Sequence, residues 1–241
     1  MNTDRIAKER MNVILLVDAS KSMQGKRMKQ VDEAILDIKN YLIDLQDENS
    51  NVDFYMTIIP FSTEASFYNN EQMINISKFD YKGIKAGGWS NLHLAYDKLG
   101  DILKKESKGG IMPDFGGVAP IILLLTDGHP TSMAYKDALK GIENTPWFKA
   151  ALRYGIAIEL DDERTTKVLK EFVKNNGDVI SCYDSNMLKN IIKIIVLTAS
   201  KVKSQSSNVT YDNNTNKSIS CHTVLQQTIA EALTEADNWE W

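Results

Sequence analysis

The sequence has few cysteines and histidines for its length. Only Cys182, Cys221 and three histidines occur among 241 residues. Two cysteines cannot build a disulfide framework, and so few sulfur and nitrogen ligands argue against a zinc cluster. We therefore expect two reduced thiols in a cytoplasmic protein.

Long apolar runs and a strong charge of one sign are also missing. No apolar stretch reaches the roughly 18–20 residues that a membrane helix needs, and residues 1–10 (MNTDRIAKER) lack the apolar core of a secretory signal. The formal net charge is -4, which disfavours nucleic acid as the main partner. We therefore expect a partner that is neither nucleic acid nor membrane, and the oligomeric state stays open.

Short apolar runs alternate with longer amphipathic segments along the chain. Strands are predicted at residues 13–17, 52–61, 121–125, 154–160 and 179–182. Helices are predicted at residues 26–45, 91–105, 134–141, 164–175 and 186–200. This alternation predicts a doubly wound α/β fold, in which helices cover both faces of a mostly parallel central sheet. Residues 62–67 are expected to return beside residues 52–61 as one antiparallel edge strand.

Composition divides the chain into three segments. Residues 1–10 form a charged lead, and residues 11–200 carry the alternating pattern of one domain. Residues 201–241 are expected to form a C-terminal extension. Its first part is polar and rich in turn residues, as linkers are, and residues 221–233 have the apolar spacing of a short helix.

Two of the predicted strands end at an aspartate. Asp18 follows the apolar run in ILLVDASKSM, and Asp127 follows the run in PIILLLTDGHP. Because sites in open α/β sheets lie at the carboxyl ends of strands, these carboxylates are expected a few ångströms apart if the strands are neighbours. Two carboxylates that close share a proton or hold a cation. Ser20 and Ser22 add neutral oxygens, and an all-oxygen set favours Mg²⁺ or Mn²⁺ over zinc.

A third loop, AGGWSNL at residues 86–92, is expected to complete the site. Its glycines let the backbone approach an ion, and Ser90 stands directly before a predicted helix. Ser90 alone also fits a plain helix N-cap. Trp89 and His129 flank the candidate ligands, and we predict that they form a rim that contacts a partner. The alternatives are burial of Trp89 under the loop and a solvent-facing His129 without a role.

Together these segments resemble the metal-ion-dependent adhesion site of von Willebrand factor type A (VWA) domains. DASKS at residues 18–22 is similar to the family's DxSxS motif, LLLTDGHP is similar to its second acidic loop, and the likeness extends over about residues 10–200. It implies a Rossmann-like VWA fold in which Ser20 and Ser22 bind a divalent cation directly, and Asp18 and Asp127 bind it directly or through water. Ser90 stands where the family usually has threonine and keeps the hydroxyl.

Such a site implies a metal-dependent protein-binding module. Five protein oxygens leave one position of a six-coordinate Mg²⁺ for water, which a carboxylate of a partner protein would displace. Mn²⁺ or Ca²⁺ would suit the same donors. The layout is most similar to the small bacterial VWA proteins of the tellurium-resistance (TerY-like) group, which implies an adaptor in bacterial stress, tellurite-resistance or phage-defence signalling.

A Mg²⁺-dependent phosphotransferase or hydrolase of the haloacid-dehalogenase type is the main alternative, because it also places an aspartate after its first strand. That chemistry needs a second acid two residues later as a proton donor, and Ser20 stands there. The sequence contains neither a GxSxG elbow nor a P-loop. We therefore predict a binding module without catalytic residues.

Overall fold

The computed structural model describes residues 8–48, 51–159, 162–175 and 177–206, with side chains described as far as residue 197. The strands are β1 (Glu9–Asp18), β2 (Val52–Phe61), β3 (Ile74–Asn75), β4 (Ile121–Thr126), β5 (Leu152–Ile158) and β6 (Val179–Cys182). The helices are α1 (Lys26–Glu48), α2 (Leu92–Ile102), α3 (Tyr135–Glu143), α4 (Pro146–Ala150), α5 (Glu163–Val173) and α6 (Ser185–Ser206). Short 3-10 helices lie at Lys21–Met23, Tyr68–Asn70, Ile76–Lys78 and Glu106–Lys108.

The six strands of the described residues form one sheet in the order β3-β2-β1-β4-β5-β6. All neighbours are parallel except β2 and β3, which are antiparallel. The sheet is therefore mostly parallel with one antiparallel edge strand, as predicted. The order reverses between β1 and β4, which makes the carboxyl ends of these two strands the switch point of the sheet.

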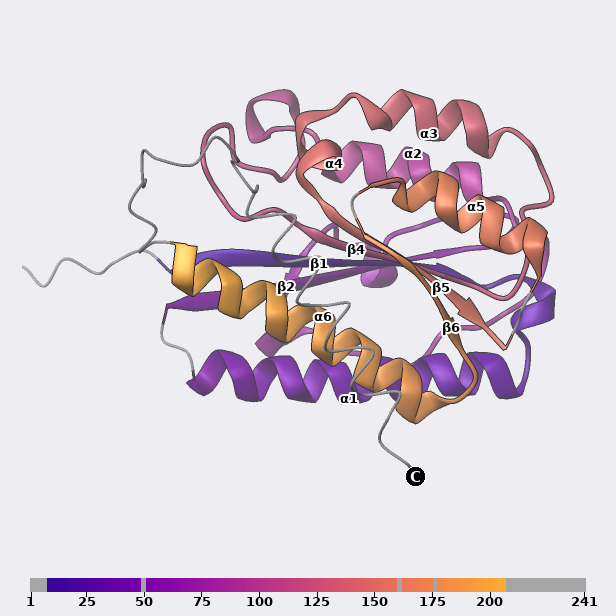
Figure 1. Cartoon of the computed structure of the whole chain (residues 1–241), viewed down its shortest axis with the longest axis horizontal. Coiled ribbons are helices and arrows are strands. Elements are labelled where there is room, and N and C mark those ends of the chain that lie inside the picture. The colour runs from indigo at the N-terminus through magenta and orange to yellow at the C-terminus, as the bar shows by residue number, and fades with distance from the viewer. Residues whose placement is uncertain (1–7, 49–50, 160–161, 176, 207–241) are drawn as a thin grey trace, which may run out of the picture.

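Helices cover both faces of the sheet. Helices α1 and α6 lie on one face, and α2, α3, α4 and α5 lie on the other (Figure 1). Alternate residues of β1 serve the two layers, since Leu15 packs with the α1 and α6 side while Ile14 and Leu16 pack with the opposite side. All three are fully buried, as expected for a parallel strand covered on both faces.

The prediction of a second strand at residues 62–67 was wrong. The antiparallel edge strand is β3, and residues 62–67 contribute only an isolated bridge between Phe61 and Ala65. Their backbone is engaged elsewhere, because the Ser62 carbonyl accepts from the Asn91 amide at 3.0 Å. This segment thus supports the glycine-rich loop instead of extending the sheet.

Helix α6 is longer than the sequence predicts. It was expected to end at residue 200, but it runs to Ser206, since residues 185–206 contain neither glycine nor proline to stop it. Residues 201–206 are therefore helix and not linker. The helix predicted at residues 221–233, together with Cys221, lies outside the described residues. Cys182 is a free, buried thiol whose pKa burial raises to about 12, in line with an unreactive role.

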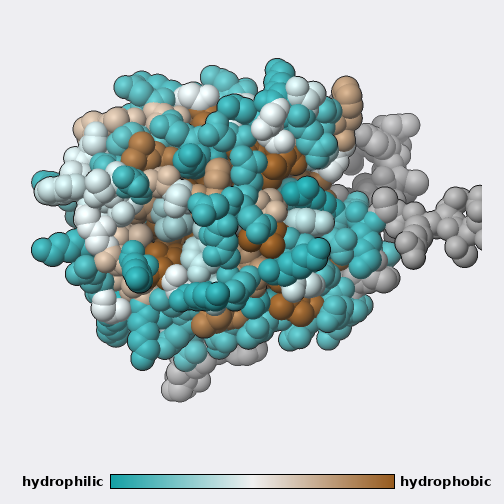
Figure 2. All heavy atoms as spheres, turned by 180° about the vertical axis from the view of Figure 1, so that it is seen from behind, coloured by the Kyte–Doolittle hydropathy of each residue, from teal (hydrophilic) through white to brown (hydrophobic). Residues whose placement is uncertain are grey.

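The rear face of the molecule is largely polar (Figure 2). Figure 2 shows a rear face dominated by hydrophilic residues, with hydrophobic residues in small separated groups. Among the described residues, no helix has both the length and the apolarity needed to cross a bilayer.

We predict that the central strand carries much of the stability. Leu15→Ala removes a fully buried side chain from β1 and should lower the free energy of unfolding by about 2–5 kcal/mol. Leu36→Ala on α1 is the matched control, because Leu36 is 42% exposed, and it should change stability by less than about 0.5 kcal/mol. Urea denaturation measures both values, and equal losses in the two variants would contradict this account of the core.

Candidate metal centre

Asp18 forms the buried floor of the centre. It is the last residue of β1 and is 1% exposed. Its Oδ1 accepts from the Ser20 amide at 2.8 Å, and its Oδ2 accepts from Thr126 Oγ1 at 2.7 Å and Ser90 Oγ at 2.9 Å. Burial raises the pKa of this carboxyl, while these hydrogen bonds act in the opposite direction. The carboxylate is therefore held in place by three segments and lacks the stabilisation of bulk water.

A chain of hydroxyls leads from the first loop to Asp127. Ser22 Oγ donates to Asp127 Oδ1 at 2.8 Å, and Ser20 Oγ lies 3.1 Å from Ser22 Oγ. Asp127 is 4% exposed and directly follows β4. The structure thus brings together the two loops that the sequence singled out.

Ser90 supplies the oxygen of the third loop. It is 8% exposed, and its hydroxyl donates to Asp18. The N-cap position of α2 is occupied by Asn91, so the plain N-cap interpretation of Ser90 was wrong. A pair of hydrogen bonds with Thr131 fixes the Ser90 backbone: Ser90 N donates to Thr131 Oγ1 at 3.0 Å, and Thr131 N donates to Ser90 O at 2.9 Å.

The glycine-rich loop approaches its neighbours closely. Gly87 N donates to Ala19 O at 2.7 Å, and Lys21 N donates to Gly88 O at 3.0 Å. Gly88 has φ +83°, and a Cβ there would lie 2.3 Å from Thr63 Oγ1. Only glycine satisfies both constraints at this position. The loop is therefore fastened to the first loop, which places Ser90 over Asp18.

The donor set suits a hard divalent cation. Two carboxylates and three hydroxyls converge from three segments, and the hydrogen bonds that link these side chains are 2.8–3.1 Å long. The described residues contain no group of three His, Cys, Asp or Glu side chains that could hold a metal. Any ion at this centre would therefore depend on serine oxygens beside the two acids, which is a Mg²⁺-like or Ca²⁺-like environment.

The rim of the centre is exposed and partly apolar. Trp89 is 65% exposed, so the alternative of burial beneath the loop was wrong. Met133, two residues after the Ser90 partner Thr131, is also 65% exposed. His129 faces solvent. An aromatic side chain next to Ser90 and a thioether side chain two residues after Thr131 are thus open to solvent.

Three contributing residues were not predicted from the sequence. Thr126 and Thr131 hold Asp18 and Ser90, and Arg27 Nη1 lies 2.7 Å from Asp127 Oδ2. Thr126 lies within the second acidic motif, LLLTDGHP, so the motif could have drawn attention to it. Arg27 and Thr131 act across 100 and 41 residues of sequence, and nothing in their own neighbourhoods signals that role.

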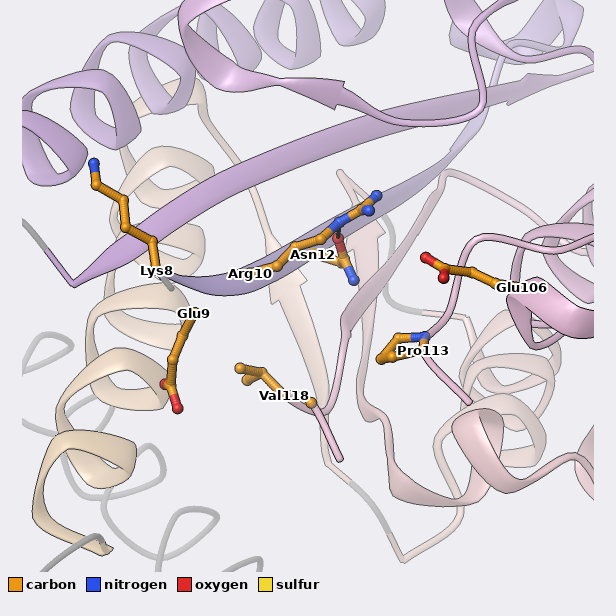
Figure 3. Close-up of a pocket in the computed structure, with 8 residues that line it drawn as sticks. Lys8, Glu9, Arg10, Asn12, Glu106, Pro113 and Val118 are labelled. Atoms are coloured by element: carbon orange, nitrogen blue, oxygen red, sulfur yellow. Dashed lines mark hydrogen bonds between the residues drawn. The ribbon is translucent and has the colours of Figure 1, made fainter. Parts of the chain in front are cut away.

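A separate pocket lies at the other end of β1. It has a volume of about 310 Å³ and is drawn in Figure 3. Both signs of charge line it, through Lys8 and Arg10 on one hand and Glu9 and Glu106 on the other, and Arg10 Nε donates to Asn12 Oδ1 at 2.9 Å. No serine, threonine, cysteine or histidine is among the residues that line it. The chemistry-bearing constellation among the described residues is thus the one around Asp18.

We predict that the hydroxyl of Thr126 stabilises the metal-free protein. Thr126→Val removes the donor to buried Asp18 and should lower the free energy of unfolding in chelator by about 1–3 kcal/mol. Thr57→Val is the matched control: Thr57 is also a buried strand residue, and its hydroxyl has no partner among the described residues. That change should be neutral or stabilising. Denaturant titration checks both, and an equal loss in Thr57→Val would contradict the assignment.

Comparisons with known proteins agree with this geometry. A family model, the von Willebrand factor type A domain, matches residues 12–194. Inter-alpha-trypsin inhibitor heavy chain H4 of Bos taurus is 32% identical over 126 residues, which are 50% of this chain and 13% of that protein. Heavy chain H2 of Mus musculus is 32% identical over 133 residues, 54% of this chain and 13% of that protein. The match thus spans a small part of these relatives.

Solved structures share the fold at low identity. The pilus adhesin SpaC from Lactobacillus rhamnosus GG superposes with a TM-score of 0.56 and 12% identity, covering 80% of this chain and 30% of that one. Proximal thread matrix protein 1 from the mussel byssus superposes with a TM-score of 0.50 and 16% identity, covering 80% of this chain and 48% of that one. The adhesion-site motif of that structure is occupied by zinc. The likeness to the tellurium-resistance group stays a prediction. With its sheet order and family match over residues 12–194, the chain belongs to the von Willebrand factor type A domain family.

Proposed function

We propose that this chain is a metal-dependent protein-binding module. The observation that carries the proposal is the convergence of Asp18, Ser20, Ser22, Ser90 and Asp127 at the switch point between β1 and β4. Sites of open α/β sheets lie at this point. Membership of the VWA family supports it, and so does the zinc reported at the adhesion-site motif of a structural relative.

The donor oxygens would be divided between the floor and the loops of the site. Ser20, Ser22 and Ser90 would offer hydroxyl oxygens, and the two carboxylates would balance the charge of the ion directly or through water. Mg²⁺ is the ion we propose, with Mn²⁺ or Ca²⁺ as substitutes, because every donor is an oxygen. A bound dication would supply one position that accepts an anionic oxygen.

The proposed ligand is an acidic side chain of a partner protein. A dication attracts a carboxylate at its open position, and exposed Trp89 and Met133 offer apolar contacts beside it. His129 belongs to the same rim. We propose a role in bacterial stress, tellurite-resistance or phage-defence signalling on the basis of the motif resemblance alone. The proposed cytoplasmic location rests on cysteine usage alone.

A phosphotransferase is supported less well. The position two residues after Asp18 is Ser20, whose hydroxyl lies 3.1 Å from that of Ser22 and cannot act as the carboxylic acid that such chemistry requires. Turnover of a phosphate ester with Mg²⁺ would favour the enzyme over the binding module.

We predict that the protein binds divalent cations through Asp18. Titration calorimetry of metal-free protein with Mg²⁺, Mn²⁺ and Zn²⁺ should show one site, and Asp18→Asn should weaken it by about 100-fold or more, since it removes a charged donor. Asp137→Asn is the matched control, because the Asp137 side chain is 88% exposed on α3, and it should bind as the unchanged protein does. Equal affinities in all three proteins would contradict the proposal.

We predict that partner capture depends on metal. A co-purified partner should dissociate in EDTA and return when Mg²⁺ is added in excess. Trp89→Ala should weaken capture by about tenfold and leave the Mg²⁺ titration unchanged, since Trp89 belongs to the rim and not to the donor set. Capture that persists in EDTA would rule out the metal as part of the interface.

A further inference from the structure

Arg27 places a positive charge directly on the candidate metal centre. It is the second residue of α1, and its Nη1 lies 2.7 Å from Asp127 Oδ2. The same nitrogen donates to the Ser22 carbonyl at 3.2 Å. The other oxygen of the carboxylate, Oδ1, accepts from Ser22 Oγ. Asp127 therefore turns one oxygen to the hydroxyl loop and the other to a guanidinium.

The guanidinium is itself held from the far side. Arg27 Nε lies 3.5 Å from Glu159 Oε2, and Glu159 Oε1 accepts from Lys26 Nζ at 2.6 Å and Gln30 Nε2 at 3.0 Å. Glu159 stands just after β5, with φ +49° and its amide bound to the Cys182 carbonyl at 2.7 Å. The Arg27 side chain is 30% exposed, and that of Asp127 is fully buried. A charged pair in this position is screened far less than one on the open surface.

Such a positive charge has opposite effects on the binding of the metal ion and on the binding of the anion that would complete the coordination of the metal. It repels an incoming dication and neutralises one of the two carboxylates that would bind it. Once a dication is present, the same charge adds to the positive field at the open position and attracts an anion.

We propose that Arg27 affects the two binding steps of the centre in opposite ways. It lowers the affinity of the centre for the metal, and it raises the affinity of the metal-loaded centre for a carboxylate ligand. The inference rests on the proposed metal-dependent function and goes beyond it. Arg27 is a positioning and charge-setting residue and not a metal ligand. A purely structural role predicts something different, because losing the support of Asp127 would weaken both steps together.

The test compares charge-neutral and charge-keeping variants. Arg27→Gln and Arg27→Met remove the charge, and Arg27→Lys keeps it. Lys29→Gln is the control, because Lys29 lies on the same helix with its side chain 77% exposed and paired with Glu33 at 3.7 Å. Mn²⁺ affinity is measured by calorimetry. Acetate binding to the Mn²⁺-loaded protein is measured through loss of water-proton relaxation as acetate displaces metal-bound water, at constant ionic strength.

We expect both neutral variants to bind Mn²⁺ about tenfold more tightly and acetate about tenfold more weakly, the scale on which a neighbouring full charge shifts binding at a partly buried site. Arg27→Lys and Lys29→Gln should resemble the unchanged protein. Two outcomes overturn the inference while the proposed function stands, provided that the unchanged protein binds Mn²⁺. In one, both neutral variants bind Mn²⁺ and acetate more weakly; in the other, both variants bind Mn²⁺ and acetate as the unchanged protein does. If the unchanged protein binds no Mn²⁺, both fall.

Discussion

The Asp18 carboxylate is 1% exposed, and a charge removed from water in this way needs compensation from its surroundings. It receives hydrogen bonds from its own loop, from the end of β4 and from the glycine-rich loop. Each of these segments is placed by a different part of the fold. The arrangement around Asp18 therefore requires the sheet and both loops to be formed together.

Strand register supplies the most exact part of this arrangement. Val17 of β1 pairs with Leu125 of β4 in parallel, so the next residues, Asp18 and Thr126, arrive side by side. Asp127 then follows on the loop, within reach of the serine hydroxyls. A shift of one residue would send Asp18 to the other face of the sheet, and the apolar side chains on both faces oppose such a shift.

The sequence was informative where a contact leaves a local trace. A buried apolar run that stops at an acid marks Asp18 and Asp127 without any knowledge of the fold, and glycines beside Ser90 mark a loop that approaches other backbone. Arg27 leaves no such trace, because an arginine in the first turn of an amphipathic helix is ordinary. Its role depends on a carboxylate 100 residues away. The edge strand was misplaced for a related reason, since residues 62–67 are engaged by a loop distant in sequence.

The side chains of the centre range from buried, at Asp18, to exposed, at Trp89. Asp18, Ser20 and Ser90 are 1%, 5% and 8% exposed, whereas Ser22 is exposed and Trp89 is 65% exposed. The inner donors are ordered by the same packing that stabilises the fold. Binding a ligand therefore requires little further loss of conformational entropy from these side chains. Only the outer residues are left to adjust to a ligand. Because the inner donors are buried and the outer residues are open to solvent, selectivity for a partner in the proposed function would depend on exposed side chains such as Trp89 and on the guanidinium of Arg27.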